Sequence, residues 1–184
     1  MSESDHKSAQ VLNIAAYKFI TLNDLDTWRA HLRTLAAQNA LKGTILLAHE
    51  GINMFMAGHA AQIAAFLYDV RGHAEFADLA VKESLSSTQP FNRLLVKIKK
   101  EIISLGRPDV DPAQQPAPRL SAQELKSWLD AGRPVLMLDT RNTYEVAAGT
   151  FRGALNLGLD NFRSFASRET QISARVHAEF AAQQ

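Results

Sequence analysis

Basic side chains gather in one short stretch of a chain that is otherwise close to neutral. The 184 residues carry a formal net charge of +1, yet residues 82–107 hold six basic and two acidic side chains, a net charge of +4. Alternating residue types within this stretch predict a β-strand with Leu94, Val96 and Ile98 facing inward and cations facing outward. Such a row suits contact with the phosphates of a nucleic acid. The predicted phosphate-binding residues are Arg93, Lys97, Lys99 and Lys100.

The same row of cations also has a purely structural interpretation. Lysines on an edge strand keep that strand solvated and prevent it from pairing with another chain. Charge alone favours this second interpretation, so a role in nucleic-acid binding needs support from elsewhere in the sequence.

A second group of charged residues follows a short apolar run. Residues 135–138 are apolar and predict a buried parallel strand, and Asp139 and Arg141 come directly after it. Because sites in α/β folds lie at the carboxyl ends of strands, Arg141 could orient or neutralise an anionic intermediate. The alternative is a structural ion pair, which is favoured for Asp139, while both interpretations stay open for Arg141. Glu145 is predicted to pair with Arg141 or Arg152.

Residue types exclude several other kinds of chemistry. The chain has no cysteine, which rules out disulfides, thiolate metal ligands and a cysteine nucleophile among these residues. The histidines lack the spacing of a metal site, so no metal is predicted. The sequence contains no glycine-rich nucleotide-binding motif, and no cofactor is identifiable from it. His49 and Glu50 could act as acid and base, but a turn with exposed polar residues is favoured.

The sequence also predicts where the protein resides. No apolar stretch approaches the roughly 20 residues that span a bilayer. Residues 1–10 lack the apolar run of a secretory signal and are predicted to be a disordered lead-in. We therefore expect no membrane contact and a cytoplasmic location.

The elements that must position the basic row follow the order β-α-β-β-α-β. Strands are predicted at residues 11–20, 44–48 and 52–57, and helices from a cap at Thr21 or Asn23 to about Asn39 and over residues 60–70. Phe55 could stack on a base, but core packing beside Met54 and Met56 is favoured. The basic segment is predicted to be the closing strand. This pattern predicts an α+β, ferredoxin-like domain over residues 11–105, with two helices packed on an antiparallel sheet.

A second unit is predicted after a proline-rich linker at residues 106–118. Ser121 and Glu124 form the sequence signature of a capping box at the start of a helix that runs to about Asp130. Strands are predicted at residues 135–138 and 154–157, with a turn at residues 149–153 between them. The tail from Asn161 is predicted to be helical.

Together these residues resemble a known family. The strand before Asp139, the Asp-Thr-Arg triplet, Glu145 and the glycines at 149 and 153 resemble the first half of a rhodanese-like domain. Residues 42–53, 82–84, 90–91 and 97–105 resemble the bacterial rhodanese-containing tRNA uridine hydroxylases. The resemblance implies an α+β chain, with the ferredoxin-like domain followed by an incomplete α/β rhodanese-like domain over residues 119–184.

The resemblance implies a function as well. Family members convert the wobble uridine of certain tRNAs to 5-hydroxyuridine with molecular oxygen as co-substrate, so tRNA and not DNA is the expected partner. The family's cysteine is expected beyond Gln184, which predicts that this chain alone is inactive. Asp139, Arg141 and Glu145 would then support the site rather than carry the reaction. A rhodanese-type sulfurtransferase and a non-catalytic RNA-binding module stay open as alternatives.

Overall fold

A computed structural model describes residues 10–107, 109–110, 112–114 and 117–181. The chain divides into two compact units, Met1–Ile103 with Asp111–Gln114 and Ser104–Val110 with Gln115–Gln184, which are described one at a time. Nearly all of the predicted lead-in at residues 1–10 lies outside the described residues, as do positions 108, 111, 115 and 116 of the predicted linker.

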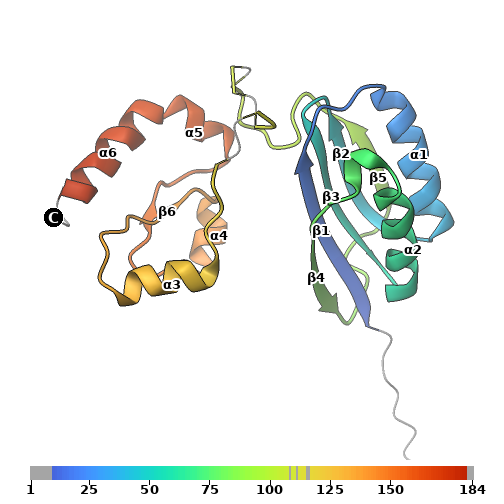
Figure 1. The fold of residues 1–184 in the computed structure, drawn as a ribbon, viewed down its shortest axis with the longest axis horizontal. Helices are drawn as coiled ribbons and strands as arrows, with labels where there is room; N and C mark the ends of the chain where they lie inside the picture. The colour runs from blue at the N-terminus through green and yellow to red at the C-terminus, as the bar shows by residue number, and fades with distance from the viewer. Residues whose placement is uncertain (1–9, 108, 111, 115–116, 182–184) are drawn as a thin grey trace, which may run out of the picture. The chain divides into compact units, whose positions relative to one another are not determined.

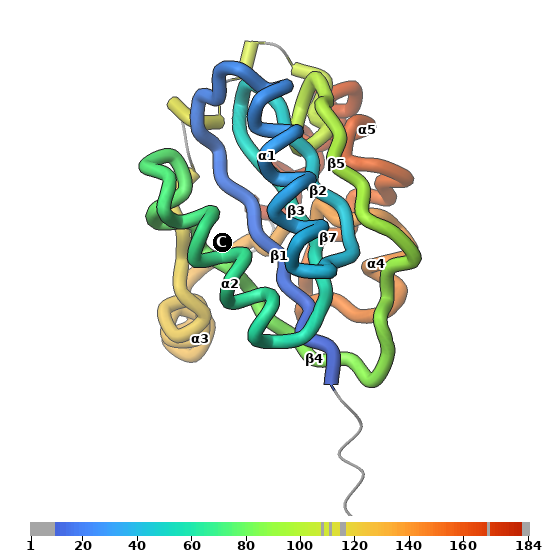
Figure 2. Tube along the Cα trace, turned by 90° about the vertical axis from the view of Figure 1, so that its right-hand side faces the viewer, coloured from blue at the N-terminus to red at the C-terminus, as the bar shows by residue number. Residues whose placement is uncertain are grey.

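The first unit is a sheet with its two α-helices on one face (Figures 1 and 2). Its elements along the chain are β1 (Val11–Phe19), α1 (Leu25–Gln38), β2 (Lys42–Ala48), β3 (Gly51–Gly58), α2 (Ala60–Arg71), the 3-10 turn η1 (Ala74–Phe76), β4 (Val81–Ser86) and β5 (Leu94–Ile98). The sheet order is β4-β1-β3-β2-β5. The first four of these strands are antiparallel to their neighbours, whereas β5 runs parallel to β2.

The predicted ferredoxin-like arrangement is confirmed, but the prediction of its closing strand was wrong. β4 closes the motif by pairing with β1, Val81 lying opposite Ala16 and Ser86 opposite Val11. The basic segment instead forms the added fifth strand on the other edge of the sheet. β4 escaped prediction because its sequence, VKESLS, is polar and mostly exposed, as an edge strand can be.

The core of the first unit lies between the helices and the sheet. Inward-facing strand residues such as Ile45 and Met54 are fully buried, as are Leu32 of α1 and Phe66 of α2. Leu94 and Ile98 pack against this core and Val96 is part of it, which confirms the predicted inward face of the basic strand. Each such large apolar side chain contributes roughly 1.5–3 kcal/mol by leaving water.

The start of α1 differs from the prediction. Neither Thr21 nor Asn23 caps the helix; Asp24 occupies the cap with a φ of 50°, a left-handed conformation that aspartate tolerates better than most residues. Leu22 explains the shift, because it is buried and its backbone N–H donates to the carbonyl of His49. This bond holds residues 21–23 against the β2–β3 turn, so the helix begins later.

The second unit has much less regular structure. Its elements are α3 (Ala122–Asp130), β6 (Leu138–Asp139), α4 (Thr143–Ala147), β7 (Leu155–Asn156), α5 (Arg163–Ser167) and α6 (Glu169–Ala181). The capping box at Ser121 is confirmed: its hydroxyl accepts from the Glu124 N–H, and the Glu124 carboxylate accepts from the Ser121 N–H. The two parallel strands also exist, but each is only two residues long, shorter than predicted.

Candidate nucleic-acid interface

The basic row lies on the outer edge of the sheet. β5 alternates as predicted, and Arg93, Lys97 and Lys99 are exposed while the alternate residues face the core. Backbone bonds fix both ends of the row, because Gly43 donates to the carbonyl of Arg93 over 3.1 Å and Lys99 donates to the carbonyl of Leu47 over 2.7 Å. Lys100 is also exposed and follows in a bend after the strand. Lys97 is thus held on the strand itself, and backbone bonds to β2 fix Arg93 and Lys99 at its two ends.

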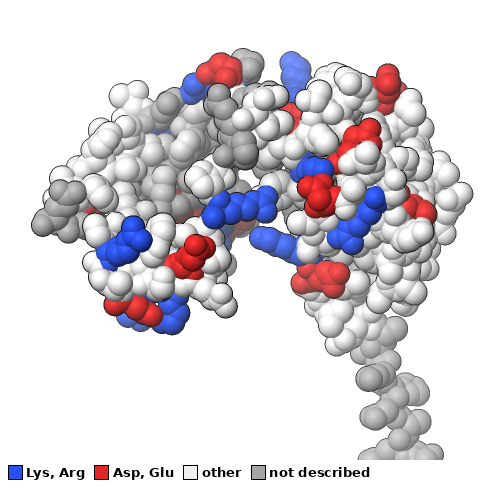
Figure 3. Space-filling model, in the orientation of Figure 1, with Lys and Arg blue, Asp and Glu red and all other residues white. Residues whose placement is uncertain are grey.

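Two further cations belong to the same sheet face, although neither is among the four predicted phosphate-binding residues. Lys82 lies opposite Ala15 on β4, and Lys42 lies opposite Ala57 on β2. Lys82 reaches this face only because β4 pairs with β1. The alternation of Lys82, Ser84 and Ser86 was the one sequence signal for that strand. On the side drawn in Figure 3, acidic and basic side chains are interspersed.

Side chains in and beside the β2–β3 turn form hydrogen bonds with backbone groups of other segments. His49 Nδ1 lies 2.9 Å from the carbonyl oxygen of Leu22, and Glu50 Oε1 accepts from the N–H of Ile102 over 2.6 Å. Asn53 also donates to the carbonyl of Ile102 over 3.2 Å. These contacts anchor the chain after β5 and give His49 and Glu50 separate structural tasks, in agreement with the favoured prediction of a turn.

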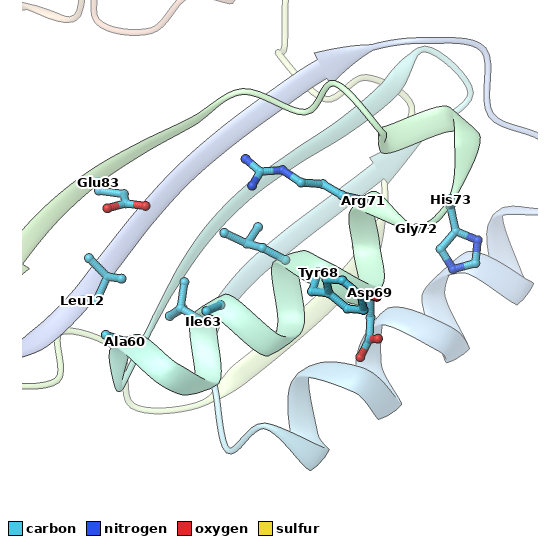
Figure 4. Close-up of a pocket in the computed structure, with 11 residues that line it drawn as sticks. Leu12, Ala60, Ile63, Tyr68, Asp69, Arg71, Gly72, His73 and Glu83 are labelled. Carbon is cyan, nitrogen blue, oxygen red and sulfur yellow. The ribbon is translucent and has the colours of Figure 1, made fainter.

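A groove lies beside α2 in the first unit (Figure 4). It encloses about 750 Å³ between α2 and the β1–β4 edge, with Leu12, Ile63 and Leu67 among its lining residues. Arg71 lines it as well, but its guanidinium donates to the carbonyl of Leu79 over 2.9 and 3.3 Å. Because the guanidinium of Arg71 is already hydrogen-bonded and the floor of the groove is apolar, this groove suits a polyanion less well than β5 does.

In the second unit, Asp139 organises the loop that follows β6. Its carboxylate accepts from Arg141 Nε at 3.0 Å, from Arg141 Nη2 at 2.7 Å and from the Thr150 hydroxyl at 2.7 Å. Arg141 also donates to the carbonyl of Gly149 over 2.6 Å. The side chain of Asp139 is only 8% exposed. The pair therefore ties two ends of a loop together, as the structural interpretation predicts.

This geometry decides the charge state of the pair. Hydrogen bonds from the Arg141 guanidinium, then from Thr150, hold the pKa of Asp139 well below its usual range. The same bond raises the pKa of Arg141. An aspartate that is this acidic stays ionised at neutral pH and is a poor general base. A pocket of about 780 Å³ lies alongside, lined in part by Asp139, Arg141 and Phe151. A supporting role for the pair at that pocket stays a prediction.

Glu145 has a different partner from the one predicted. Its carboxylate accepts from the backbone N–H of Asn142 over 3.2 Å, which completes a capping box at the start of α4. Among the described residues it makes no direct ion pair with Arg141 or Arg152, but its charge adds to that of Asp139 in raising the pKa of Arg141. The sequence had the signal for this cap, because Asn142 precedes Glu145 by three residues.

Replacing Asp139 by Asn should loosen the loop it holds. The neutral amide loses the charge-assisted bonds to Arg141, so we expect faster amide hydrogen exchange in a peptide spanning residues 139–153, measured by mass spectrometry. In the unchanged protein the same loosening should appear only below about pH 4, because the depressed pKa of Asp139 keeps its stabilisation intact above the unfolded-state pKa. That stabilisation fades as the pH falls toward the lowered folded-state value.

The exposed Asp130 supplies the control for this experiment. It pairs with Lys126 over 2.8 Å on the surface of α3, so Asp130→Asn removes an ion pair of the solvated kind. In the Asp130→Asn variant, amide hydrogen exchange near residue 139 should match that of the unchanged protein. Equal exchange in the Asp139 and Asp130 variants would show that the loop does not depend on the Asp139 carboxylate.

The described part of the chain contains neither a metal-binding cluster nor a membrane-spanning helix. Histidine, aspartate and glutamate side chains do not gather there in groups of three or more that could hold a metal ion. No helix within those residues is both long and apolar enough to cross a membrane.

Comparison with known sequences places the chain in a family. Residues 11–102, half of the chain, match the model of the UPF0176 acylphosphatase like domain. The chain is 52% identical to the tRNA uridine(34) hydroxylase of Cupriavidus metallidurans, covering 85% of this chain and 57% of that protein. It is 50% identical to the protein of the same name from Cupriavidus necator, over 93% of this chain and 64% of the relative. The chain thus spans about three fifths of the length of these relatives.

Solved structures give looser matches. An acylphosphatase from Bacillus subtilis superposes with a TM-score of 0.36 at 20% identity, covering 48% of this chain and 97% of that one. A structure titled BlrP1 BLUF gives a TM-score of 0.43 at 8% identity, covering 65% and 86%. The family assignment therefore rests on the sequence match. The chain belongs to the family of the UPF0176 acylphosphatase like domain, whose relatives described above are named tRNA uridine(34) hydroxylase.

Proposed function

We propose that this chain provides the tRNA-binding part of an enzyme that converts the wobble uridine of certain tRNAs to 5-hydroxyuridine. The observation that carries the proposal is the basic row on β5, which lies within a chain about half identical to relatives named tRNA uridine(34) hydroxylase. Phosphate contacts of this kind hold a nucleic acid in place without reading its sequence. The edge-strand interpretation is weaker, because further cations share the same sheet face.

In this proposal the first unit binds the tRNA backbone through Arg93, Lys97, Lys99 and Lys100. The second unit is the first part of a rhodanese-like domain, in which Asp139 and Arg141 hold the loop after β6 in shape. Molecular oxygen is the co-substrate, and the reaction takes place in the cytoplasm, where tRNA is available. Since these 184 residues include no cysteine, any thiol step requires a residue outside them.

Loss of the gene should remove the modification from tRNA. We expect mass spectrometry of tRNA from a deletion strain to show unmodified wobble uridines in place of 5-hydroxyuridine and its derivatives. Restoring the gene should bring the modification back. Wobble uridines that are equally modified with and without the gene would rule out the hydroxylase.

The sulfurtransferase alternative makes a different prediction for the same strain and protein. It predicts thiosulfate-to-cyanide sulfur transfer by the gene product, with 5-hydroxyuridine unchanged in the deletion strain. A non-catalytic RNA-binding module would show neither the transfer nor the change in tRNA. The two assays together separate all three functions.

A further inference from the structure

The sheet of the first unit has one face that its own helices leave uncovered. Both α-helices pack on the opposite face (Figures 1 and 2), where Ile14, Ile45 and Met54 are buried. Side chains alternate along a strand, so the neighbouring residues Ala15, Thr44 and Phe55 face the other way. The chain after β5 crosses one end of this open face, where Asn53 bonds to Ile102. The part around Phe55 is not covered in this way.

Phe55 lies near the centre of the open face, contrary to the favoured prediction of core packing. Met54 and Met56 on either side are fully buried, whereas Phe55 is 49% exposed. Its direct cross-strand neighbours are Ala15 on β1 and Thr44 on β2. Because both neighbours are small, they leave the aromatic ring standing above its surroundings. Nothing in the packing of the first unit requires a phenylalanine there.

A second aromatic residue accompanies Phe55. Tyr17 is 45% exposed and lies on β1 opposite Asn53, one diagonal step from Phe55. Its ring makes an edge-to-face contact with Phe19, with the ring centroids 6.0 Å apart. Diagonal neighbours on adjacent strands lie about 7–8 Å apart, within reach of one another's aromatic side chains. The open face therefore presents aromatic surface on its two central strands.

Cations surround these rings, and the outward-facing strand positions carry no acidic residue. Lys82 lies in the same cross-strand row as Phe55, two strands away on β4. Lys97 lies opposite Leu46, two strands away on the other side. At about 4.8 Å per strand, the two lysines flank the rings across roughly 19 Å. Aromatic rings between cations complement a polyanion whose bases are unpaired, since double-stranded RNA hides its base faces.

We propose that the open face of this sheet binds single-stranded RNA, with an unpaired base stacked on Phe55 and phosphates held by Lys82 and Lys97. The proposal rests on the tRNA-binding function above and narrows it, because it implies that a loop, and not a helical stem, lies on the sheet. Four-stranded sheets with exposed aromatics are known to stack two or three bases in this way. A protein partner or a second copy of the chain is the competing occupant.

The test measures the affinity of the 184-residue chain for a ten-nucleotide oligouridylate and for a duplex RNA of equal length. Phe55→Ala should weaken binding of the single strand by roughly tenfold to a hundredfold, because one stacked base is lost. Phe55→Trp should retain binding, and its added fluorescence should be quenched by the oligonucleotide. Phe55→Leu keeps apolar bulk without a π-face and should bind as weakly as the alanine variant. Affinity for the duplex should be equal in all four proteins.

Two controls separate stacking from general effects. Tyr68 is 81% exposed on α2, on the helix side, so Tyr68→Ala removes an exposed aromatic outside the proposed surface and should leave affinity unchanged. Phe55→Ala should also leave the slope of affinity against salt unchanged, because no charge is lost, whereas Lys82→Ala should lower that slope by about one.

The possible outcomes are distinct. Undiminished single-strand binding by Phe55→Ala and Phe55→Leu would overturn the stacking proposal, while tRNA hydroxylation, read from the deletion strain, would stand. Equal losses for the single strand and the duplex would also overturn it. The proposal would also be overturned if the unchanged protein bound no RNA and Phe55→Ala changed only the oligomeric state measured by sedimentation. That result would assign this face to a protein contact.

Discussion

Gly43→Ala should destabilise the first unit by roughly 3 kcal/mol. Gly43 lies on β2 with a φ of +142°, a conformation that side chains rarely adopt. An added Cβ would lie 2.1 Å from the carbonyl oxygen of Phe55 and 2.7 Å from the Cα of Met56. Both obstacles are backbone atoms in the middle of the sheet, so no side chain can rotate away. Urea denaturation followed by Trp28 fluorescence, in a Trp128→Phe background, reports the loss for this unit.

Gly72 provides the matched control within the same unit. It ends α2 with a φ of −65°, which any residue adopts, and its nearest obstacle to a Cβ is 3.1 Å away. Gly72→Ala should therefore shift the urea midpoint far less. If both alanine variants unfold at similar urea concentrations, the close approach of β2 and β3 at Phe55 is not what requires glycine at position 43.

Removing Lys97 of β5 and Lys99, which follows the strand, should have the largest effect on binding. We expect the Lys97→Ala and Lys99→Ala double variant to bind tRNA at least tenfold more weakly at low salt. Hydrogen bonds to charged groups contribute roughly 1.5–3 kcal/mol each, and 1.4 kcal/mol corresponds to a factor of ten. Both side chains are exposed, so the fold should not change. Filter binding with purified tRNA measures the loss, and circular dichroism confirms folding.

Lys126→Ala controls for net charge. Lys126 is an exposed lysine on α3 of the second unit and is paired with Asp130. Its removal lowers the charge of the chain by one without touching the sheet. If Lys126→Ala weakened tRNA binding as much as each lysine removed in the Lys97→Ala and Lys99→Ala double variant, the affinity would depend only on the net charge of the protein.

The fold of the first unit could largely be predicted because its buried strands and helices follow clear periodicities. The β2–β3 hairpin and α2 appear close to the predicted residues, and β5 turns the predicted side chains inward. The error concerned the polar edge strand β4. Its pairing partner β1 lies some 70 residues earlier, and its own residues bury little, so the alternation of Lys82, Ser84 and Ser86 is the one local signal that distinguishes it from a loop.

Phe55 shows why the open face could not be predicted. It stands in a continuous apolar run from Met54 to Met56, in which every residue looks like a core residue. Only the register, with Phe55 between Ala15 and Thr44, decides that it faces outward. A shift of one residue would reverse the faces of the strand. The grouping of Lys82 with Lys97 depends in the same way on strand order, which is a tertiary property.

The second unit was harder to predict for a different reason. Its described core has four buried residues, Leu155, Leu157, Leu159 and Ile172, against twenty in the first unit. With so small a core, apolar runs do not become long strands, and β6 covers only Leu138–Asp139 of the run predicted at residues 135–138. The cap at Ser121 could be predicted because it needs only neighbouring residues, and the cap at Asn142 carries the same kind of local signal although it was not predicted.

The salt dependence of tRNA binding tests the central claim most directly, namely that this sheet face contacts the phosphates of tRNA. The logarithm of the affinity of the 184-residue chain should fall linearly with the logarithm of the salt concentration. For the Lys97→Ala and Lys99→Ala double variant, the slope should be smaller by about two, one for each phosphate that the protein no longer neutralises. A slope equal to that of the unchanged chain would contradict phosphate contact by β5.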